Sequence, residues 1–290
     1  MSVTDLAGVT APSAAPRRRR SRPSPLILCS MVVMAVVLAC VVFGAAIAPH
    51  DPAAQNLQSG LQLPSAEHWL GTDSSGRDIA SRLIVGARSA FVGPCFVALG
   101  AALIATLLGL LAGYRGGWRD AVVMRGADLL YAFPGLLVLM VAIGVLGGGY
   151  VVAVALLAIL TAPADVRLVR GATLEQSTLP YVDAARTLGL SRWKIMLRHI
   201  WPNVLPLIVA SAFLDFAYSL VALSALSFLG LGVEPGAPNW GLMLSDNLSL
   251  LDGNPAAVLA PGIALVATAV SMNLLGDWFY ERLSDRGRAR

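Results

Sequence analysis

Charged residues are scarce in this chain. They make up 13% of its 290 residues, compared with roughly 25% in ordinary soluble domains. Hydrophobic residues reach 57%, and the mean hydropathy is +0.71. This composition excludes a typical soluble domain and indicates a membrane protein that crosses the bilayer several times.

The motifs of several enzyme classes are also missing. No glycine-rich loop ends in Lys-Ser or Lys-Thr, so the chain should not bind ATP in the Walker manner. There is no HExxH segment, no Cys-x-x-Cys pair and no nucleophile elbow. We therefore expect neither catalysis nor a bound cofactor, and the energy source for any active process must be another chain.

Histidine and cysteine are equally rare, with three residues of each. His50, His68 and His199 are expected on loops at opposite sides of the membrane, so we predict that they do not form one metal site. The cysteines fall in or at the edge of apolar runs and are expected to be packing residues rather than disulfides. They are Cys29, Cys40 and Cys95.

The chain contains six apolar runs. They cover residues 26–48, 87–112, 121–146, 147–161, 205–229 and 256–279. Most reach the roughly 20 residues that a helix needs to cross the hydrocarbon core. The fourth is short, and its boundary with the third is left open. The first exceeds the apolar length of roughly 7–15 residues in a signal peptide, so we expect it to be retained as a helix. These runs predict an all-α polytopic membrane protein with six transmembrane helices.

Basic residues are distributed unevenly between the loops. With six spans, 18 of the 21 Lys and Arg residues fall on the side that also holds both termini. Cytoplasmic loops carry such an excess, so both termini are predicted to be cytoplasmic in the cell membrane. Residues 1–25, rich in Pro, Ser and Arg, are predicted to form a disordered tail that contacts anionic lipid rather than nucleic acid.

The loop at 49–86 is then predicted to be extracytoplasmic. It ends in the polar stretch HWLGTDSSGRDIASRL. Asp73, Arg77, Asp78 and Arg82 lie close enough in sequence to pair with one another. We expect solvated local salt bridges, which contribute little to stability.

The segment at 181–206 predicts two short helices where a plain turn would suffice. Asp183 lies near the start of the first helix, where a carboxylate suits the positive helix end. Ala184 and Ala185 would let a partner approach closely. Gly189 can adopt the left-handed conformation that ends the helix, and Ser191 can cap the next one.

An apolar stripe is predicted along the second of these helices. Its members recur at offsets of three, four, seven and eight: Trp193, Met196, Leu197, Ile200 and Trp201. Lys194 and Arg198 fall on the opposite side. The pattern favours a helical hairpin at the membrane surface, either docked to a cytosolic partner or resting on lipid headgroups.

Asp215 is the strongest candidate for an ionisable group inside the membrane. It lies about ten residues into the fifth run. Such groups are costly in lipid, so we expect it either to hydrogen-bond a neighbouring helix or to line a wet pathway. No partner is evident in the sequence, which argues against a proton-coupled carrier that needs a relay near the midplane.

The motif Asp183-Ala184-Ala185, followed by Gly189 and by Pro202 thirteen positions later, resembles the EAA loop of ABC importer permeases. Residues 70–90, 128–138, 227–244 and 273–286 resemble the C-type subunit of the dipeptide, oligopeptide and nickel branch of that family. The resemblance runs from about residue 26 to 286. The chain departs from it at Asp183, where Glu is usual, and at His199 and Trp201, where Ile and Leu are usual.

The resemblance implies a type I ABC importer permease fold, with a permease core at 87–286, a cytoplasmic coupling loop at 163–204 and a short cytoplasmic tail at 287–290. Its implied partners are a homologous B-type permease subunit, two ATP-binding subunits or domains, an extracytoplasmic solute-binding protein and membrane lipid. Di- or oligopeptides would cross between the two permeases by alternating access, with the loop docked in a cleft of an ATPase subunit. Two alternatives stay open: an ion-coupled secondary carrier and a non-transporting membrane scaffold.

Overall fold

The computed structural model describes residues 24–56, 60–146 and 149–288. The expected disorder and lipid contact of the basic tail fall almost wholly outside these ranges. Within them the chain is built from helices and loops. Ten α-helices are formed: α1 (Pro25–Ile47), α2 (Ile79–Arg115), α3 (Gly117–Tyr131), α4 (Gly135–Leu146), α5 (Tyr150–Ser177), α6 (Pro180–Thr187), α7 (Arg192–Ile195), α8 (Trp201–Phe228), α9 (Trp240–Asn247) and α10 (Pro255–Arg288). A π-helical turn, Met196–Ile200, joins α7 to α8.

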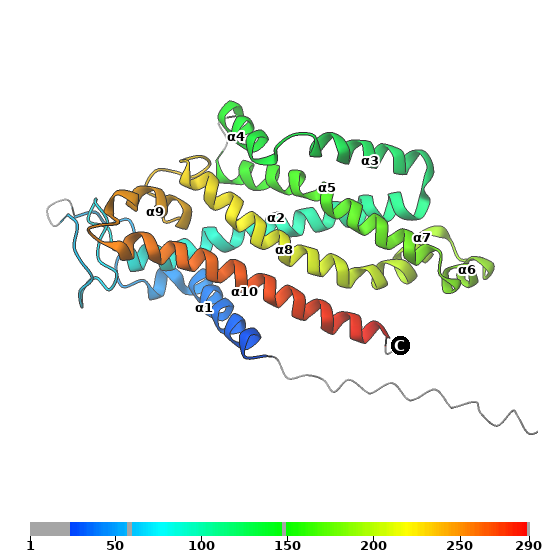
Figure 1. Cartoon of the computed structure of the whole chain (residues 1–290), viewed down its shortest axis with the longest axis horizontal. Helices are drawn as coiled ribbons and strands as arrows, with labels where there is room; N and C mark the ends of the chain where they lie inside the picture. The colour runs from blue at the N-terminus through cyan, green and yellow to red at the C-terminus, as the bar shows by residue number, and fades with distance from the viewer. Residues whose placement is uncertain (1–23, 57–59, 147–148, 289–290) are drawn as a thin grey trace, which may run out of the picture.

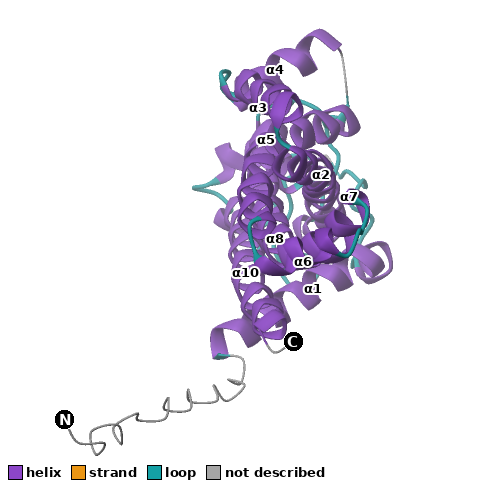
Figure 2. Ribbon diagram, turned by 90° about the vertical axis from the view of Figure 1, so that its right-hand side faces the viewer, coloured by secondary structure: helices purple, strands orange, loops and turns teal. Residues whose placement is uncertain are grey.

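The helices form one elongated bundle. Figure 1 shows α2, α5, α8 and α10 extending along the long axis, and α2 packs on both α5 and α8. The short helices α6 and α7 lie at one end, which we call the α6 end. Helix α9 and the segments at 49–56 and 60–78 lie at the opposite end, the α9 end. Figure 2 views the bundle from the α6 end, with α3 and α4 at one edge and α1 towards the other.

Five described helices are long and apolar enough to cross a membrane, and the pair α3–α4 would make a sixth. The third predicted run is not one straight span, because α3 and α4 meet at an angle of 79°. Pro134 lies in the break. Proline disfavours helical conformation in the residue before it and offers no backbone N–H, so a helix commonly ends at this position.

Several helices extend beyond their predicted spans. Helix α2 begins inside the predicted outer loop at Ile79, and α5 continues to Ser177, well past the predicted end at 161. The predicted coupling loop at 163–204 therefore begins as the last four turns of a helix. Hydropathy predicts only the apolar part of a helix, which faces lipid, so the charged continuation of the same helix is missed. The charged C-terminal part of α5 is instead held by ion pairs: Arg170 Nη2 lies 2.6 Å from Asp120 Oδ2, and Arg167 Nη2 lies 2.7 Å from Asp128 Oδ1.

Small residues let α2 and α5 approach closely. A Cβ atom at Gly113 of α2 would lie 2.7 Å from the Cβ of Thr173 on α5, a distance that real side chains do not adopt. Small residues at helix contacts are the usual means of tight packing in membranes, where water supplies no hydrophobic drive between helices. The α2–α5 contact is thus fixed by the sequence of both helices.

The polar network at the start of α2 is buried, not solvated as predicted. Arg82 is 1% exposed and Asp73 is also 1% exposed. Arg77 Nε donates to Asp73 Oδ2 at 2.6 Å. Arg82 donates to the carbonyl oxygens of Gly236 and Ala237, at 3.0 and 3.3 Å. The loop before α9 covers these side chains, and a contact this distant in sequence cannot be read from local spacing.

Candidate functional site

The hairpin at the α6 end has the local structure that its sequence predicts. Gly189 has φ +74°, the left-handed conformation that glycine adopts most readily. Leu190 N–H donates to the Ala185 carbonyl and Gly189 N–H to that of Arg186, at 3.2 and 3.0 Å. These two bonds form a Schellman motif, which ends α6. Ser191 Oγ then accepts from Lys194 N–H and caps α7.

One face of α6 is buried and the other is open. Val182 is fully buried and Ala185 is 4% exposed, and both pack against a cluster that includes Val169 of α5 and Ile195 of α7. Ala185 is therefore a packing residue, whereas we expected it to face a partner. The exposed face consists of Asp183, Ala184, Arg186, Thr187 and Leu188.

This exposed face carries one large apolar side chain and one ion pair. Leu188 is 79% exposed at the end of α6. Asp183 Oδ1 lies 3.0 Å from Arg186 Nη1, and both side chains are largely solvent-accessible. A pair of this kind contributes little to stability, so the two charges are free to engage another surface.

The second helix of the hairpin differs from its predicted stripe. Met196 and Ile200 are buried as expected, but Trp193 and Leu197 are more than half exposed. The π-helical turn causes the difference: its hydrogen bonds span five residues, so the buried face rotates relative to a regular α-helix. The Trp193 ring is partly covered, because the Arg115 guanidinium group lies over it, 4.8 Å from the ring centroid.

Pro202 follows this π-helical turn, in the first turn of α8. The adjoining Asn203 Nδ2 donates to the His199 carbonyl oxygen at 2.8 Å and to Tyr181 Oη at 3.2 Å. These bonds join the start of α6 to the start of α8. Nothing in the structure explains why His and Trp replace the usual residues at 199 and 201.

Asp215 lines a cavity of about 280 Å³ between the α3–α4 break, α5 and α8. Aromatic side chains surround much of it, including Tyr131, Phe133 and Tyr218. Asp215 also has a partner that sequence reasoning missed. The carboxyl group of Asp165, on α5, lies next to it, and the Oδ2 atom of each is buried without a hydrogen-bond partner among the described residues. Asp165 was overlooked because the fourth span was predicted to end before it.

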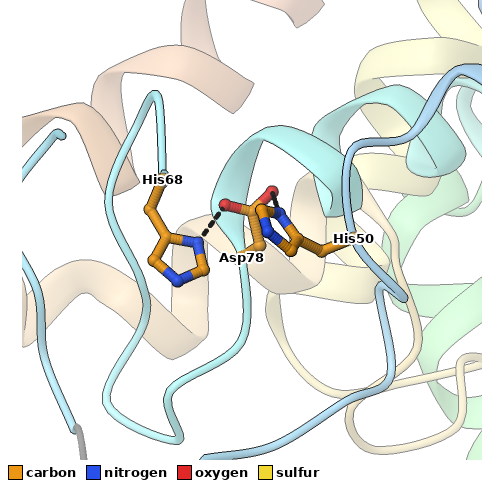
Figure 3. Close-up of side chains that lie close together, drawn as sticks. All are labelled: His50, His68 and Asp78. Carbon is orange, nitrogen blue, oxygen red and sulfur yellow. Dashed lines mark hydrogen bonds and ion pairs between the residues drawn. The ribbon is translucent and has the colours of Figure 1, made fainter. Parts of the chain in front are cut away.

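Two of the three histidines lie together, whereas the sequence predicted only that the three do not form one site. The rings of His50 and His68 have centroids 4.8 Å apart at the α9 end, beside Asp78 (Figure 3). His199 lies at the α6 end. Burial by itself would raise the pKa of the Asp78 carboxyl, but hydrogen bonds from Ser81 and His68 outweigh burial and hold the pKa below its usual value.

The chain matches known proteins over most of its length. A glutathione transport system permease protein of Pectobacterium atrosepticum is 41% identical over 223 residues, which cover 77% of this chain and 74% of the relative. A probable D,D-dipeptide transport system permease protein of Escherichia coli is 36% identical, with 91% and 88% covered. A dipeptide transport system permease protein of Alkalihalophilus pseudofirmus is 33% identical, with 92% and 88% covered.

The fold also has a solved counterpart. An inward-facing structure of the MetNI methionine ABC transporter superposes with a TM-score of 0.55 at 20% identity, covering 70% of this chain and 96% of the other. The architecture is therefore that of a type I ABC importer permease. The family model described as binding-protein-dependent transport system inner membrane component matches residues 105–288. Together with relatives above 30% identity, this match shows that the chain belongs to that family.

Proposed function

We propose that this chain is the C-type permease subunit of an importer for di- or oligopeptides. Members of its family are transport subunits, and ATP is hydrolysed by separate subunits of such importers. The proposal rests on the family match combined with the hairpin at the α6 end of the bundle. One face of this hairpin packs into the bundle, and its other face is exposed. The names of the relatives, which include dipeptide and glutathione transport, favour a peptide substrate.

The proposed orientation places both termini in the cytoplasm, together with the α6 end. Figure 1 shows the start of α1 on the side of the bundle that faces away from α9, and α10 ending towards α6. With six crossings, both termini lie on one side of the membrane. The excess of Lys and Arg on that side supports a cytoplasmic location.

In this orientation the exposed face of α6 would dock on an ATPase subunit. Leu188 offers an apolar anchor, and Asp183 offers a charge that is not tied to the rest of the bundle. Helix-in-groove recognition uses this combination of a compact face and few charges. Because Val182, Ala185 and Ile195 pack into the cluster with α2 and α5, movement of the docked hairpin would be passed to both helices.

The cavity at Asp215 is proposed to line the pathway that this subunit forms with a homologous B-type subunit. The Asp215 carboxyl group, which lines this cavity next to Asp165, offers a polar contact for the amino-terminal ammonium group of a peptide. The rings of Tyr131 and Tyr218 supply apolar area nearby. Ionisable groups at such depth face cavities or partners rather than lipid.

Reconstitution in liposomes tests this function. The chain should import a radiolabelled peptide only with its partner permease, the ATPase subunits, ATP and a peptide-loaded extracytoplasmic binding protein. Uptake by the chain alone that stops when a proton or sodium gradient collapses would instead identify an ion-coupled carrier, which the buried carboxyl pair makes worth testing. Unchanged uptake in cells lacking the chain, with loss of another membrane complex, would identify a scaffold.

A further inference from the structure

The cluster of His50, His68 and Asp78 is built from three separate parts of the α9 end. His50 follows the end of α1, His68 lies in the segment between α1 and α2, and Asp78 caps the start of α2. Figure 3 shows the two imidazole rings on either side of the Asp78 carboxyl group. One nitrogen of each histidine and one carboxylate oxygen lie within 4.8 Å of one another. None of these side chains belongs to the hairpin or to the Asp215 cavity.

One buried ring nitrogen in the cluster has no hydrogen bond among the described residues. His50 Nδ1 is buried and has no hydrogen-bond partner among the described residues, although it points towards Asp78 Oδ2 at 3.8 Å. Buried polar atoms are normally satisfied, so an orphaned imidazole nitrogen facing a buried carboxylate needs an explanation. A bound cation would supply one.

The other ligand atoms are already positioned. His68 Nδ1 lies 2.8 Å from Asp78 Oδ1. Asp78 Oδ2 accepts hydrogen bonds from Ser81 N–H and Ser81 Oγ, at 2.8 and 2.7 Å, which fixes the carboxyl plane and leaves Oδ1 for a ligand. Ser81 Oγ also accepts from His50 N–H at 2.9 Å. One residue thus holds two members of the cluster, as second-shell groups do in metal sites.

The spacing of these atoms suits a small transition-metal ion. Two ligands about 2.1 Å from a tetrahedral zinc ion are about 3.4 Å apart. His68 Nδ1 lies 2.8 Å from Asp78 Oδ1, His50 Nδ1 lies 3.8 Å from Asp78 Oδ2, and one ligand atom from each residue lies within 4.8 Å of the others, so small side-chain adjustments would bring the three around one ion. Two imidazoles and one carboxylate are donors that zinc and its neighbours accept, whereas Mg²⁺ and Ca²⁺ prefer oxygen ligands alone. The His50 side chain is 36% exposed, so water can reach a fourth position.

Neighbouring positive charges do not block the cluster. Arg77 is bound to Asp73 and Asp246, and Arg82 to Asp73 and to loop carbonyl oxygens, so both guanidinium groups are engaged away from Asp78. The start of α2 brings a partial positive charge, but the Asp78 carboxylate offsets it.

We propose that His50 Nδ1, His68 Nδ1 and a carboxylate oxygen of Asp78 form a site for a divalent transition-metal ion of the zinc class. On binding, the ion takes the place of the proton on His68 Nδ1, and the neutral imidazole then carries its proton on Nε2. The ion links the end of α1, the segment at 60–78 and the start of α2. The site is distinct from substrate transport and makes the α9 end a metal-stabilised cap.

Calorimetric titration of the full-length chain tests the site directly. The chain is purified in nanodiscs with a histidine-free tag and stripped with EDTA, and zinc chloride or magnesium chloride is then added. We expect one zinc ion per chain and no saturable magnesium binding. His50→Gln and His68→Gln should each weaken zinc binding by at least the roughly 10–100-fold that loss of a second-shell partner costs. His199→Gln, a matched change at the α6 end, should bind zinc as the wild type does.

A second measurement keeps the test decisive if a variant folds poorly. Zinc should raise the melting temperature of the wild type and of His199→Gln with the logarithm of its concentration relative to Kd, but not that of His50→Gln. Cobalt bound to the wild type should show the intense visible bands of a four-coordinate ion rather than those of the hydrated ion. Absence of saturable zinc binding, or zinc binding that is unchanged in both His50→Gln and His68→Gln, would overturn the proposal.

Discussion

The guanidinium group of Arg82, on α2, lies 3.0 Å from the carbonyl oxygen of Gly236, in the loop before α9. The two residues are 154 positions apart in the chain, and the contact closes the α9 end over a buried charge network. Arg82 Nη1 also donates to the Pro52 carbonyl oxygen at 3.3 Å, so one side chain joins both segments that cap this end.

Replacement of this arginine should destabilise the α9 end. Arg82→Met keeps the length of the side chain but leaves Asp73 with fewer partners in a buried setting. Breaking a buried ion network by removing one member typically costs about 3–5 kcal/mol. We expect a lower melting temperature by tryptophan fluorescence and faster proteolysis near residue 236. Arg88→Met, on an exposed site of the same helix, should leave both unchanged. Equal stability of the two variants would show that the buried network is dispensable.

Substitution at the turn of the hairpin should separate ATP hydrolysis from uptake. Gly189→Val forces a branched side chain into a left-handed conformation that costs roughly 1–2 kcal/mol per residue for L-amino acids. The Schellman motif should open and displace the exposed face of α6. We expect the variant to reach the membrane and to lose uptake while the assembled complex still hydrolyses ATP. Gly171→Val, at an exposed helical glycine with open space around its Cα, is the matched control. Normal uptake by Gly189→Val would refute the docking role of the hairpin.

Charge reversal on the exposed face should weaken assembly. Asp183→Lys removes an exposed ion pair that contributes at most about 1 kcal/mol to stability, so the subunit itself should fold normally. We expect less ATPase subunit to co-purify with this variant than with the wild type. Asp252→Lys makes the same change on an exposed residue at the α9 end and should have no effect. If both variants retain the ATPase subunits equally, Asp183 takes no part in docking.

The carboxyl pair should matter for peptides with a free amino terminus. Asp215→Asn keeps the shape of the side chain but removes the carboxyl group that can pair with an ammonium group. Loss of a hydrogen bond to a charged group costs roughly 1.5–3 kcal/mol, which corresponds to a rate lower by about tenfold or more. We expect this loss for free peptides and a much smaller one for N-acetylated peptides, measured by uptake in liposomes. Asp277→Asn, on an exposed part of α10, should transport both alike. An equal loss for both peptides would assign Asp215 to folding instead.

Structural features that depend on residues close together in the chain could be predicted from the sequence. Gly189 and Ser191 mark the end and start of two helices because each acts on backbone groups within four residues of itself. The apolar runs predicted the membrane helices because a run of apolar residues is likewise a property of neighbouring positions in the sequence. The break at Pro134 carries a local signal too, and the apolar composition on both sides obscured it.

Features created by tertiary contacts could not be predicted in this way. Ala185 turns inward because α2 and α5 lie beneath it, and Arg82 is buried because a loop far along the chain covers it. Asp165 meets Asp215 only because α5 extends past its apolar part. His50 and His68 are brought together by the folding of the segment between α1 and α2, which no periodicity in the sequence encodes.

Helix α2 has 37 residues and spans about 55 Å at the rise of an α-helix. Its first turn holds Ser81, which positions the His50, His68 and Asp78 cluster, and its last residue, Arg115, covers Trp193 of the hairpin. One continuous helix, with Pro94 inside it, therefore joins the two sites. A tilt of α2 would displace residues at both membrane faces together.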